Sequence, residues 1–460
     1  MSGTGNPFHD VDLGGRQATA LYDSWSQRWR PRRRKLLALT YIAIVFSLLL
    51  FLAEFSSSTK STVRLESPGS PSSNGIYITT TTTISAPGVT ETAIVYQNVA
   101  VKPEPVVFVL IIWSESSAIE GALLIKSVLL YNSSPSHVHI ICDDSAQKFL
   151  EARFALVHRP LHDVRIWFYK PSWQSMLDRV EREGSIKSDH SAGLPGLMKL
   201  FIHEILPPSV KKGIYVDTDA LFISDPTLLW NVFKRLKPST AVVMSSHPDQ
   251  NAPIWYHASR ICSCVMLLDL EKLRALRLMD SRRYANSQPL ALSPPAFQAK
   301  YGLPGGDDQG RYDNVRLGDQ GYWWAIVDHR PDIFEPLSYD FEVTSCLLDG
   351  YMTGLGDDAI SEKEELSRQI HIKDTPQEGK VVLPKLLHFN CLHGTPVYTE
   401  WDGWSDPANS LNIRWGASVA YHSGFKWIWL NKGDEELAST LEMLIIPNII
   451  FADELEANLD

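Results

Sequence analysis

Short apolar segments alternate with helical segments through the middle of this chain, and this alternation constrains the fold more than any other feature. Four apolar runs with β-branched residues are typical of buried strands; they span residues 106–113, 138–142, 164–169 and 214–216. Three segments with apolar residues at helical spacing separate them, at 118–131, 148–157 and 197–206. This order predicts βαβ units and therefore an α/β fold, with a Rossmann-like, mostly parallel sheet flanked by helices.

Two aspartates follow the fourth run, in the order Val216-Asp217-Thr218-Asp219. Strand side chains alternate between faces, so Asp217 and Asp219 are expected on the same side of the backbone. Paired carboxylates at a strand end suit Mn²⁺ or Mg²⁺, and ligands bind at that edge in open α/β sheets. D-x-D alone also fits a solvated turn. Because the chain has no G-x-G-x-x-G after the first run and no P-loop, a diphosphate needs another anchor, and a metal at these aspartates would supply one.

The first hundred residues differ in composition from the rest. A basic stretch, in which six of the eight residues at 28–35 are Arg or Lys, precedes an uncharged apolar run of 18 residues at 36–53. That run is about long enough to span a bilayer, and the positive flank predicts a cytosolic N-terminus and a lumenal remainder. A cleaved signal peptide fits less well, because the basic region lies far from Met1. The short span suits the membranes of the early secretory pathway, the Golgi or the ER.

Five domains or segments are expected on this basis. They are a cytosolic basic tail (1–35), a transmembrane anchor (36–53), a Ser/Thr-rich disordered stem (54–103), a catalytic α/β domain (104–430) and an acidic C-terminal tail (431–460). The formal net charge of −10 argues against a nucleic-acid partner.

The five cysteines all follow the apolar run, in a compartment where disulfides are permitted. An odd number leaves at least one of them unpaired within the chain. Cys262-x-Cys264 has the wrong spacing for a zinc ribbon. Asn132 begins an N-glycosylation sequon and is expected on a surface turn.

Three motifs together resemble glycosyltransferase family eight. They are G-L-M-K-L at 196–200, I-L-P at 205–207 and V-D-T-D at 216–219, and the resemblance extends over about 106–401. Within the family, the chain is most similar to the xylosyltransferase domain of LARGE-type enzymes, and next to the glucoside xylosyltransferases. The resemblance implies a GT-A fold, a UDP-sugar donor, Mn²⁺ (or Mg²⁺) and retention of anomeric configuration.

The resemblance also implies roles for particular residues. Asp217, Asp219 and His388, the last in L-L-H-F-N at 386–390, match the metal ligands. Asp319 and Gln320, at the start of an amphipathic segment, match the catalytic pair. A second D-Q-G, at 308–310, lies inside a Pro/Gly-rich insertion and is the weaker match to the catalytic pair. His393 is likewise a weaker match than His388 to the metal-binding histidine. The expected donor contacts are Trp113, Lys199, Asp217, Thr218 and Ser263.

The chain departs from the family pattern at two places. Cys262 and Cys264 replace an Asn and a Gly, and the usual Lys-Pro-Trp ending is absent. A thiol is a poor substitute for an amide as a sugar ligand, so the donor sugar stays open between xylose, which is favoured, and glucose or galactose. The acceptor is expected to be a glycan on a glycoprotein or glycolipid. A catalytically inactive glycan-binding protein and a nucleotide-sugar hydrolase remain as alternatives, and front-face attack and double displacement both remain open.

Overall fold

The computed structural model describes residues 76–86, 89–99, 103–183, 186–188, 190–247, 257–277, 315–345, 376–392, 397–435 and 439–457, with a few isolated positions between 361 and 394. The chain divides into two compact units, Met1–Ala100 and Val101–Asp460.

The described part of the first unit is a β-hairpin. Strand β1 (Ile76–Ala86) pairs antiparallel with β2 (Val89–Val99) along its whole length. The prediction of a disordered stem at 54–103 is therefore wrong for these two strands, in which Thr, Ile, Val and Tyr favour extended backbone. The predicted anchor at 36–53 lies outside the described residues. Among the helices that the structure describes, none has the length and apolar character needed to cross a bilayer.

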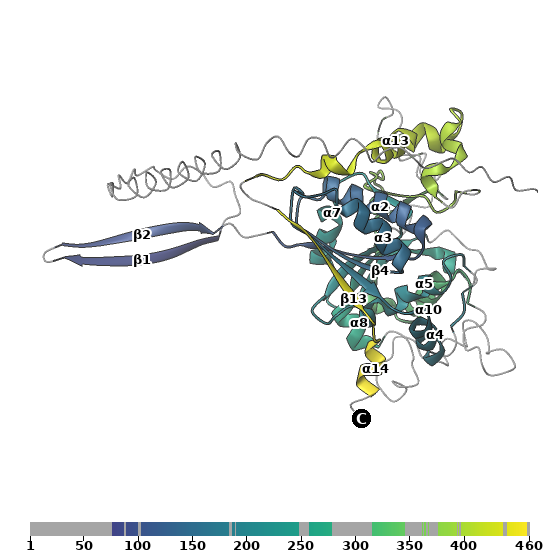
Figure 1. Ribbon diagram of the computed structural model, residues 1–460, viewed down its shortest axis with the longest axis horizontal. Coiled ribbons are helices and arrows are strands. Elements are labelled where there is room, and N and C mark those ends of the chain that lie inside the picture. The colour runs from purple at the N-terminus through teal and green to yellow at the C-terminus, as the bar shows by residue number, and fades with distance from the viewer. Residues whose placement is uncertain are drawn as a thin grey trace, which may run out of the picture. The chain divides into compact units, whose positions relative to one another are not determined.

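The second unit is built on an eight-stranded sheet with the order β10-β8-β9-β6-β3-β4-β5-β13 (Figure 1). Every neighbouring pair is parallel except the two that involve β9, which runs opposite to the rest. The strands are β3 (Val106–Ile112), β4 (Ser136–Cys142), β5 (Val164–Lys170), β6 (Lys212–Val216), β8 (Val242–Ser246), β9 (Ile261–Asp269), β10 (Phe334–Leu337) and β13 (Leu441–Pro447). The predicted α/β class with a mostly parallel sheet is confirmed.

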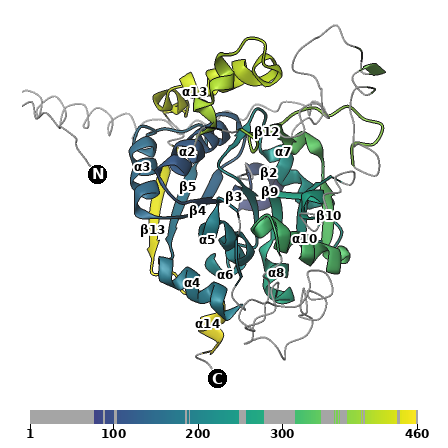
Figure 2. The same ribbon diagram turned by 90° about the vertical axis from the view of Figure 1, so that its right-hand side faces the viewer.

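Helices cover both faces of this sheet (Figure 2). On one face, α2 (Glu115–Tyr131), α3 (Asp144–Phe154) and α7 (Thr227–Trp230) pack on Phe108, Leu110 and their neighbours. The other face packs against a second set: α4 (Trp173–Arg182), α5 (Gly193–Leu197), η1 (Met198–Phe201), α6 (Ile202–Ile205), α8 (Leu270–Leu276) and α10 (Asp319–His329). Each face thus has its own buried apolar core.

The helix predicted at 197–206 is a composite segment that begins earlier, at Gly193. Its middle turn, η1, is a tighter 3₁₀ turn whose four residues are all buried. Lys199 lies in that turn and is 6% exposed, so the turn buries the lysine that was predicted to contact the donor.

A small second sheet joins residues that are far apart in the sequence. Strand β12 (Leu386–His388) pairs antiparallel with β7 (Ala220–Phe222) and parallel with β11 (Val343–Thr344). His388 lies opposite Ala220, and the Phe389 amide donates to the Asp219 carbonyl at 2.9 Å. This pairing brings the predicted histidine beside the predicted aspartates.

The remaining helical segments are short and complete the second unit. They are η2 (Asn231–Arg235), η4 (Ala258–Arg260), η6 (Pro331–Ile333), η7 (Tyr339–Phe341), η9 (Tyr398–Glu400), η10 (Asp402–Ser405), η11 (Asn412–Gly416), α13 (Ala417–Gly424), η12 (Trp427–Leu430) and α14 (Ala452–Ala457).

The segment after residue 430 belongs to the main sheet. Strand β13 pairs in parallel with β5 from Leu441↔Val164 to Pro447↔Lys170. The predicted boundary at 430 therefore does not mark a break in the fold. The acidic residues on either side led to the prediction of a tail, but the apolar run L-I-I at 444–446 belongs to an edge strand of the sheet.

The sequon residue Asn132 is buried rather than on an exposed turn. It caps the end of α2, is 4% exposed, and donates from its amide nitrogen to the Ser134 carbonyl and the Ser136 hydroxyl. The prediction of a surface-exposed sequon is wrong for the folded chain.

Candidate metal and donor site

Three candidate metal ligands meet at the end of β6. Asp217 and Asp219 follow the last residue of that strand, and His388 is the last residue of β12. One ligand atom from each lies within 4.8 Å of the others. His388 Nε2 lies 3.3 Å from Asp219 Oδ1. The two carboxylates and the imidazole predicted from sequence are thus adjacent, and they form a donor set that suits a divalent cation.

Charge couples Asp219 and His388. Burial alone would lower the pKa of His388, but Asp219 and then Glu342 outweigh it and raise that pKa to about 10. Burial alone would raise the pKa of Asp219, and the neighbouring imidazolium outweighs it and lowers the value. Without a cation, the histidine therefore carries a proton that a bound metal would have to replace.

Lys199 lies between the carboxylates of Asp217 and Asp319. Its Nζ lies 2.9 Å from Asp217 Oδ1 and 3.5 Å from Asp319 Oδ2. The Tyr215 hydroxyl donates to Asp217 Oδ1 at 2.6 Å, and the Ser263 hydroxyl donates to Asp319 Oδ2 at 2.7 Å. Burial raises the pKa of Asp319, although Lys199 opposes this. The result is a connected network of buried charges along one wall of the site.

This network lines a cavity of about 380 Å³. Because β9 is antiparallel to β6, its first residues lie at the same edge as Asp217, whose amide donates to the Cys264 carbonyl at 2.8 Å. Gln320 reaches the cavity from the first turn of α10, and its side-chain amide donates to the Ala258 carbonyl at 3.0 Å. Seven predicted site residues share the cavity: Lys199, Asp217, Asp219, Ser263, Asp319, Gln320 and His388.

Two predicted donor contacts lie elsewhere. Trp113 packs against Trp173, with ring centroids 6.3 Å apart, and is not among the residues that line the cavity. The Thr218 hydroxyl donates to Glu120 at 3.4 Å, on the far side of the D-x-D turn. Thr218 therefore points away from the two aspartates, as expected when alternate residues lie on opposite faces of the backbone, and its hydrogen bond supports the turn.

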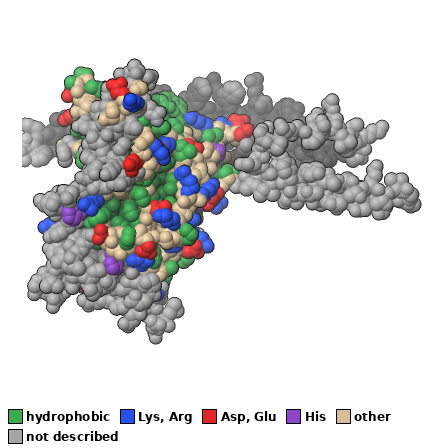
Figure 3. Space-filling model, turned by 180° about the vertical axis from the view of Figure 1, so that it is seen from behind, with side chains coloured by type: hydrophobic (Ala, Val, Ile, Leu, Met, Phe, Trp, Pro, Cys, Tyr) green, Lys and Arg blue, Asp and Glu red, His purple; other side chains and the backbone are tan. Residues whose placement is uncertain are grey.

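A larger cavity of about 760 Å³ is lined by Trp167, His203, Ile446 and other residues that include none of the predicted site residues. Hydrophobic side chains also gather on the back of the molecule, bordered by charged ones (Figure 3). Because the larger cavity contains none of the predicted site residues, the smaller, charged cavity is the candidate site.

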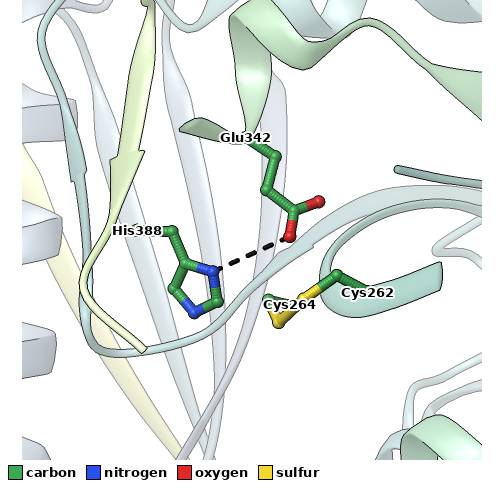
Figure 4. A group of neighbouring side chains, drawn as sticks. All are labelled: Cys262, Cys264, Glu342 and His388. Carbon is green, nitrogen blue, oxygen red and sulfur yellow. Dashed lines mark ion pairs between the residues drawn. A yellow bond between two sulfur atoms is a disulfide. The ribbon is translucent and has the colours of Figure 1, made fainter. Parts of the chain in front are cut away.

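Glu342 is a site residue that the sequence analysis missed. It is fully buried, and its Oε1 lies 3.7 Å from His388 Nδ1 (Figure 4). Asp219 contacts the other ring nitrogen, Nε2. Burial raises the pKa of Glu342, and His388 opposes the shift. The surrounding sequence, Y-D-F-E-V-T, has no pattern that distinguishes this carboxylate from a surface one.

The two cysteines that depart from the family pattern form a disulfide with each other (Figure 4). Cys391 is also disulfide-bonded, and Cys142 is a free, buried thiol. One unpaired cysteine agrees with the odd number. The Cys262–Cys264 disulfide lines the cavity where the family has an amide and a glycine.

Comparisons with known proteins agree with the motifs. No protein-family model matches the chain. Mouse LARGE2, a xylosyl- and glucuronyltransferase, is 34% identical over 144 residues, which are 31% of this chain and 19% of that protein. Human LARGE1, of the same description, is 34% identical over 134 residues, or 29% of this chain and 16% of that protein. The matched part spans less than a fifth of the length of these relatives.

Among solved structures, mouse xyloside xylosyltransferase 1 is 16% identical, with a TM-score of 0.43, and covers 64% of this chain and 100% of its own. The predicted similarity to LARGE-type glycosyltransferases is confirmed by the curated relatives, whose names describe them as xylosyl- and glucuronyltransferases.

Proposed function

We propose that this chain is a metal-dependent glycosyltransferase of the GT-A type, which moves a sugar from a UDP-sugar to a glycan acceptor with retention of configuration. The observation that carries the proposal is the convergence of Asp217 and Asp219, in the turn between β6 and β7, with His388 at the end of β12, so that their ligand atoms lie within 4.8 Å of one another. The similarity to LARGE1 and LARGE2 supports the same chemistry.

The residues fit a bound divalent cation. Two carboxylates and an imidazole are the donors that Mn²⁺ or Mg²⁺ accepts, and His388 Nε2 lies 3.3 Å from Asp219 Oδ1. When bound, the cation would neutralise the diphosphate of a UDP-sugar as UDP leaves. Lys199, whose Nζ lies 2.9 Å from Asp217, adds a fixed positive charge on the same side.

Asp319 and Gln320 are assigned to the transferred sugar. The Asp319 carboxylate is held by Lys199 and the Ser263 hydroxyl, so it is oriented before any ligand arrives. An oriented carboxylate with fixed partners is suited to accept hydrogen bonds from sugar hydroxyl groups and to hold the donor in one geometry. The cavity of about 380 Å³ has the volume for one sugar and part of the diphosphate.

Xylose is the donor sugar that we favour, because the relatives are named as xylosyl- and glucuronyltransferases and the sequence motifs resemble xylosyltransferase domains. The proposed cellular setting is the lumen of the Golgi, with residues 36–53 as a type II membrane anchor. A thermal-shift screen of UDP-sugars with Mn²⁺ tests the donor, since a ligand that binds only the folded chain raises its Tm. If only UDP-glucose or only UDP-galactose raised the Tm, that sugar and not xylose would be the donor.

The central test is UDP release by the purified protein with Mn²⁺, with Mg²⁺ and with EDTA. We expect release that depends on metal and increases when acceptor is added. Release indifferent to acceptor would indicate a hydrolase, and no release with any UDP-sugar would indicate a binding protein.

Asp219→Asn keeps the shape of the side chain but removes a charged ligand. We expect turnover to fall by roughly 100-fold or more, since metal stabilisation of the departing charge contributes several kcal/mol. Asp402→Asn, at an exposed position on η10, is the matched control and should keep wild-type turnover. Equal activity of the two variants would refute the metal assignment.

A further inference from the structure

We propose that reduction of the Cys262–Cys264 disulfide opens a second metal site, in which both sulfurs join Glu342 and His388 to bind a thiophilic divalent cation such as Zn²⁺. Ligand atoms of these four residues lie within 4.8 Å of one another, and all four residues are buried. Two sulfurs, one imidazole nitrogen and one carboxylate oxygen form a donor set typical of four-coordinate zinc.

The two metal sites would lie on opposite edges of one imidazole ring. His388 Nε2 lies 3.3 Å from Asp219, whereas Nδ1 lies 3.7 Å from Glu342. Cys262 and Cys264 are two residues apart on β9, so their side chains leave the same face of the strand. Figure 4 shows Glu342 directed at the imidazole from the side on which the disulfide lies.

Glu342 provides independent support for a cation at this position. It is fully buried, yet neither of its carboxylate oxygens receives a hydrogen bond from the residues that the structure describes, and neither does His388 Nδ1 make one there. The His388 imidazole lies at ion-pair distance, with Nδ1 3.7 Å from Glu342 Oε1. A buried carboxylate that lacks hydrogen bonds is costly, and a coordinated cation would satisfy it.

The chemistry needs one reductant of the thiol class. A dithiol transfers two electrons and two protons to the disulfide, so that two Cys thiols form and the dithiol closes to its own disulfide. Zn²⁺ then displaces the two thiol protons to solvent as it binds the sulfurs. The disulfide lines the open cavity, so a small reductant has access to it.

Occupation of this second site should weaken the first. Only one ring nitrogen of a neutral imidazole has a lone pair available, so neutral His388 can coordinate one cation at a time. This consequence, unlike the site itself, rests on the proposed function of His388 as a manganese ligand. We expect Zn²⁺ to inhibit the reduced protein more than the oxidised protein.

Cobalt absorption tests the site without any sugar substrate. The full chain is titrated with Co²⁺ under nitrogen, either oxidised or reduced with a water-soluble phosphine, which becomes the phosphine oxide by taking oxygen from water. We expect sulfur-to-cobalt charge-transfer absorption and tetrahedral d–d bands at one equivalent, only after reduction. Added Zn²⁺ should abolish both.

Variants assign the absorption to these sulfurs. Cys264→Ser should remove most of the charge-transfer band, and Glu342→Gln should weaken Co²⁺ binding while the band persists. Reduction also opens the disulfide of Cys391, so Cys391→Ser is the control and should keep the band.

Three results would overturn the proposal. The first is no charge-transfer absorption in reduced wild type. The second is a band that survives Cys264→Ser. The third is loss of the cooperative unfolding transition when Cys391→Ser, which lacks the other disulfide, is reduced; that loss would make the Cys262–Cys264 disulfide a structural bond. None of these depends on whether the protein transfers sugar.

Discussion

At the scale of single residues, the candidate site is a set of buried charges that stabilise one another. Lys199 is 6% exposed and lies between Asp217 and Asp319, and His388 is 1% exposed and lies between Asp219 and Glu342. Each cation thus compensates two carboxylates. Buried ions are tolerated only when paired in this way, so loss of one cation should destabilise the fold as well as the site.

Lys199→Met tests this compensation, because it keeps the volume and removes the charge. We expect the free energy of unfolding to fall by about 3 kcal/mol, since the buried Asp319 carboxylate and the partly exposed Asp217 carboxylate lose their partner. Urea unfolding without added metal measures it. Lys211→Met is the control: its ion pair with Glu271 is 64% and 63% exposed, and such pairs contribute about 1 kcal/mol or less. Similar losses in both variants would contradict the compensation.

Glu120 makes the stability of the folded chain depend on pH. Burial, followed by Asp219, raises the pKa of Glu120 from 4.5 to about 7. The Glu120 carboxyl releases its proton above pH 4.5 in the unfolded chain, but only above about pH 7 in the folded chain. The contribution of Glu120 to the free energy of unfolding therefore decreases between pH 4.5 and about 7, and it stays low at higher pH.

Glu120→Gln should therefore stabilise the metal-free chain at pH 8 but not at pH 4.5. The gain is at most about 3 kcal/mol, and the amide oxygen can still accept the Tyr398 N–H. Denaturant unfolding at a series of pH values in EDTA measures the difference between variant and wild type. A difference that does not change with pH would show that Glu120 titrates normally.

At the scale of elements, the first turn of α10 places Asp319 and Gln320 in the cavity. Gly321, the third residue of the D-Q-G motif, packs so closely that a Cβ atom there would lie 2.1 Å from the Arg316 carbonyl oxygen. Gly318, just before the helix, has φ +55°, which favours glycine. Both glycines are needed for the approach of this helix to the preceding segment.

Gly321→Ala should move the start of α10 and misplace Asp319. We expect a loss of about 1–3 kcal/mol in stability, as for overpacked positions, together with a larger relative loss of turnover. Gly424→Ala, at the end of α13, has nothing within 4 Å of the added Cβ atom and should be neutral or slightly stabilising. Wild-type activity in Gly321→Ala would show that the close contact does not position the helix.

Elements with strong local patterns were predictable, whereas the contacts between them were not. Strands β3 to β6 and the adjacency of Asp217 and Asp219 follow from apolar runs and strand alternation. The place of His388 came only from the family resemblance, because an L-L-H run looks the same in any core strand. Glu342 and the burial of Lys199 depend on β11, β12 and the 3₁₀ turn, for which local sequence has no signal.

At the scale of the whole second unit, the C-terminal segment is held to the core by a buried ion network. Arg179 of α4 is 1% exposed and pairs with Glu183 and Glu204, both at 2.8 Å. Asp453 of α14, fully buried at its carboxylate, lies 2.7 Å from Arg182 and 3.6 Å from Arg179. A segment that composition alone marked as an acidic tail thus contributes a carboxylate to the interior as well as an edge strand.

Asp453→Ala should therefore destabilise the whole unit rather than release a tail. Arg179 keeps Glu183 and Glu204 as partners, but Arg182 loses two hydrogen bonds to the buried Asp453 carboxylate. We therefore expect a loss of about 3 kcal/mol in a single cooperative transition. Glu454→Ala is the control, since the Glu454 side chain is 34% exposed and also pairs with Arg182 at 2.8 Å; it should cost about 1 kcal/mol or less. Tryptophan fluorescence during urea unfolding follows the core directly, because Trp323 is fully buried on the face that α14 joins. If Asp453→Ala unfolded at the same urea concentration as Glu454→Ala, the C-terminal segment would have to be regarded as attached to the domain through β13 alone.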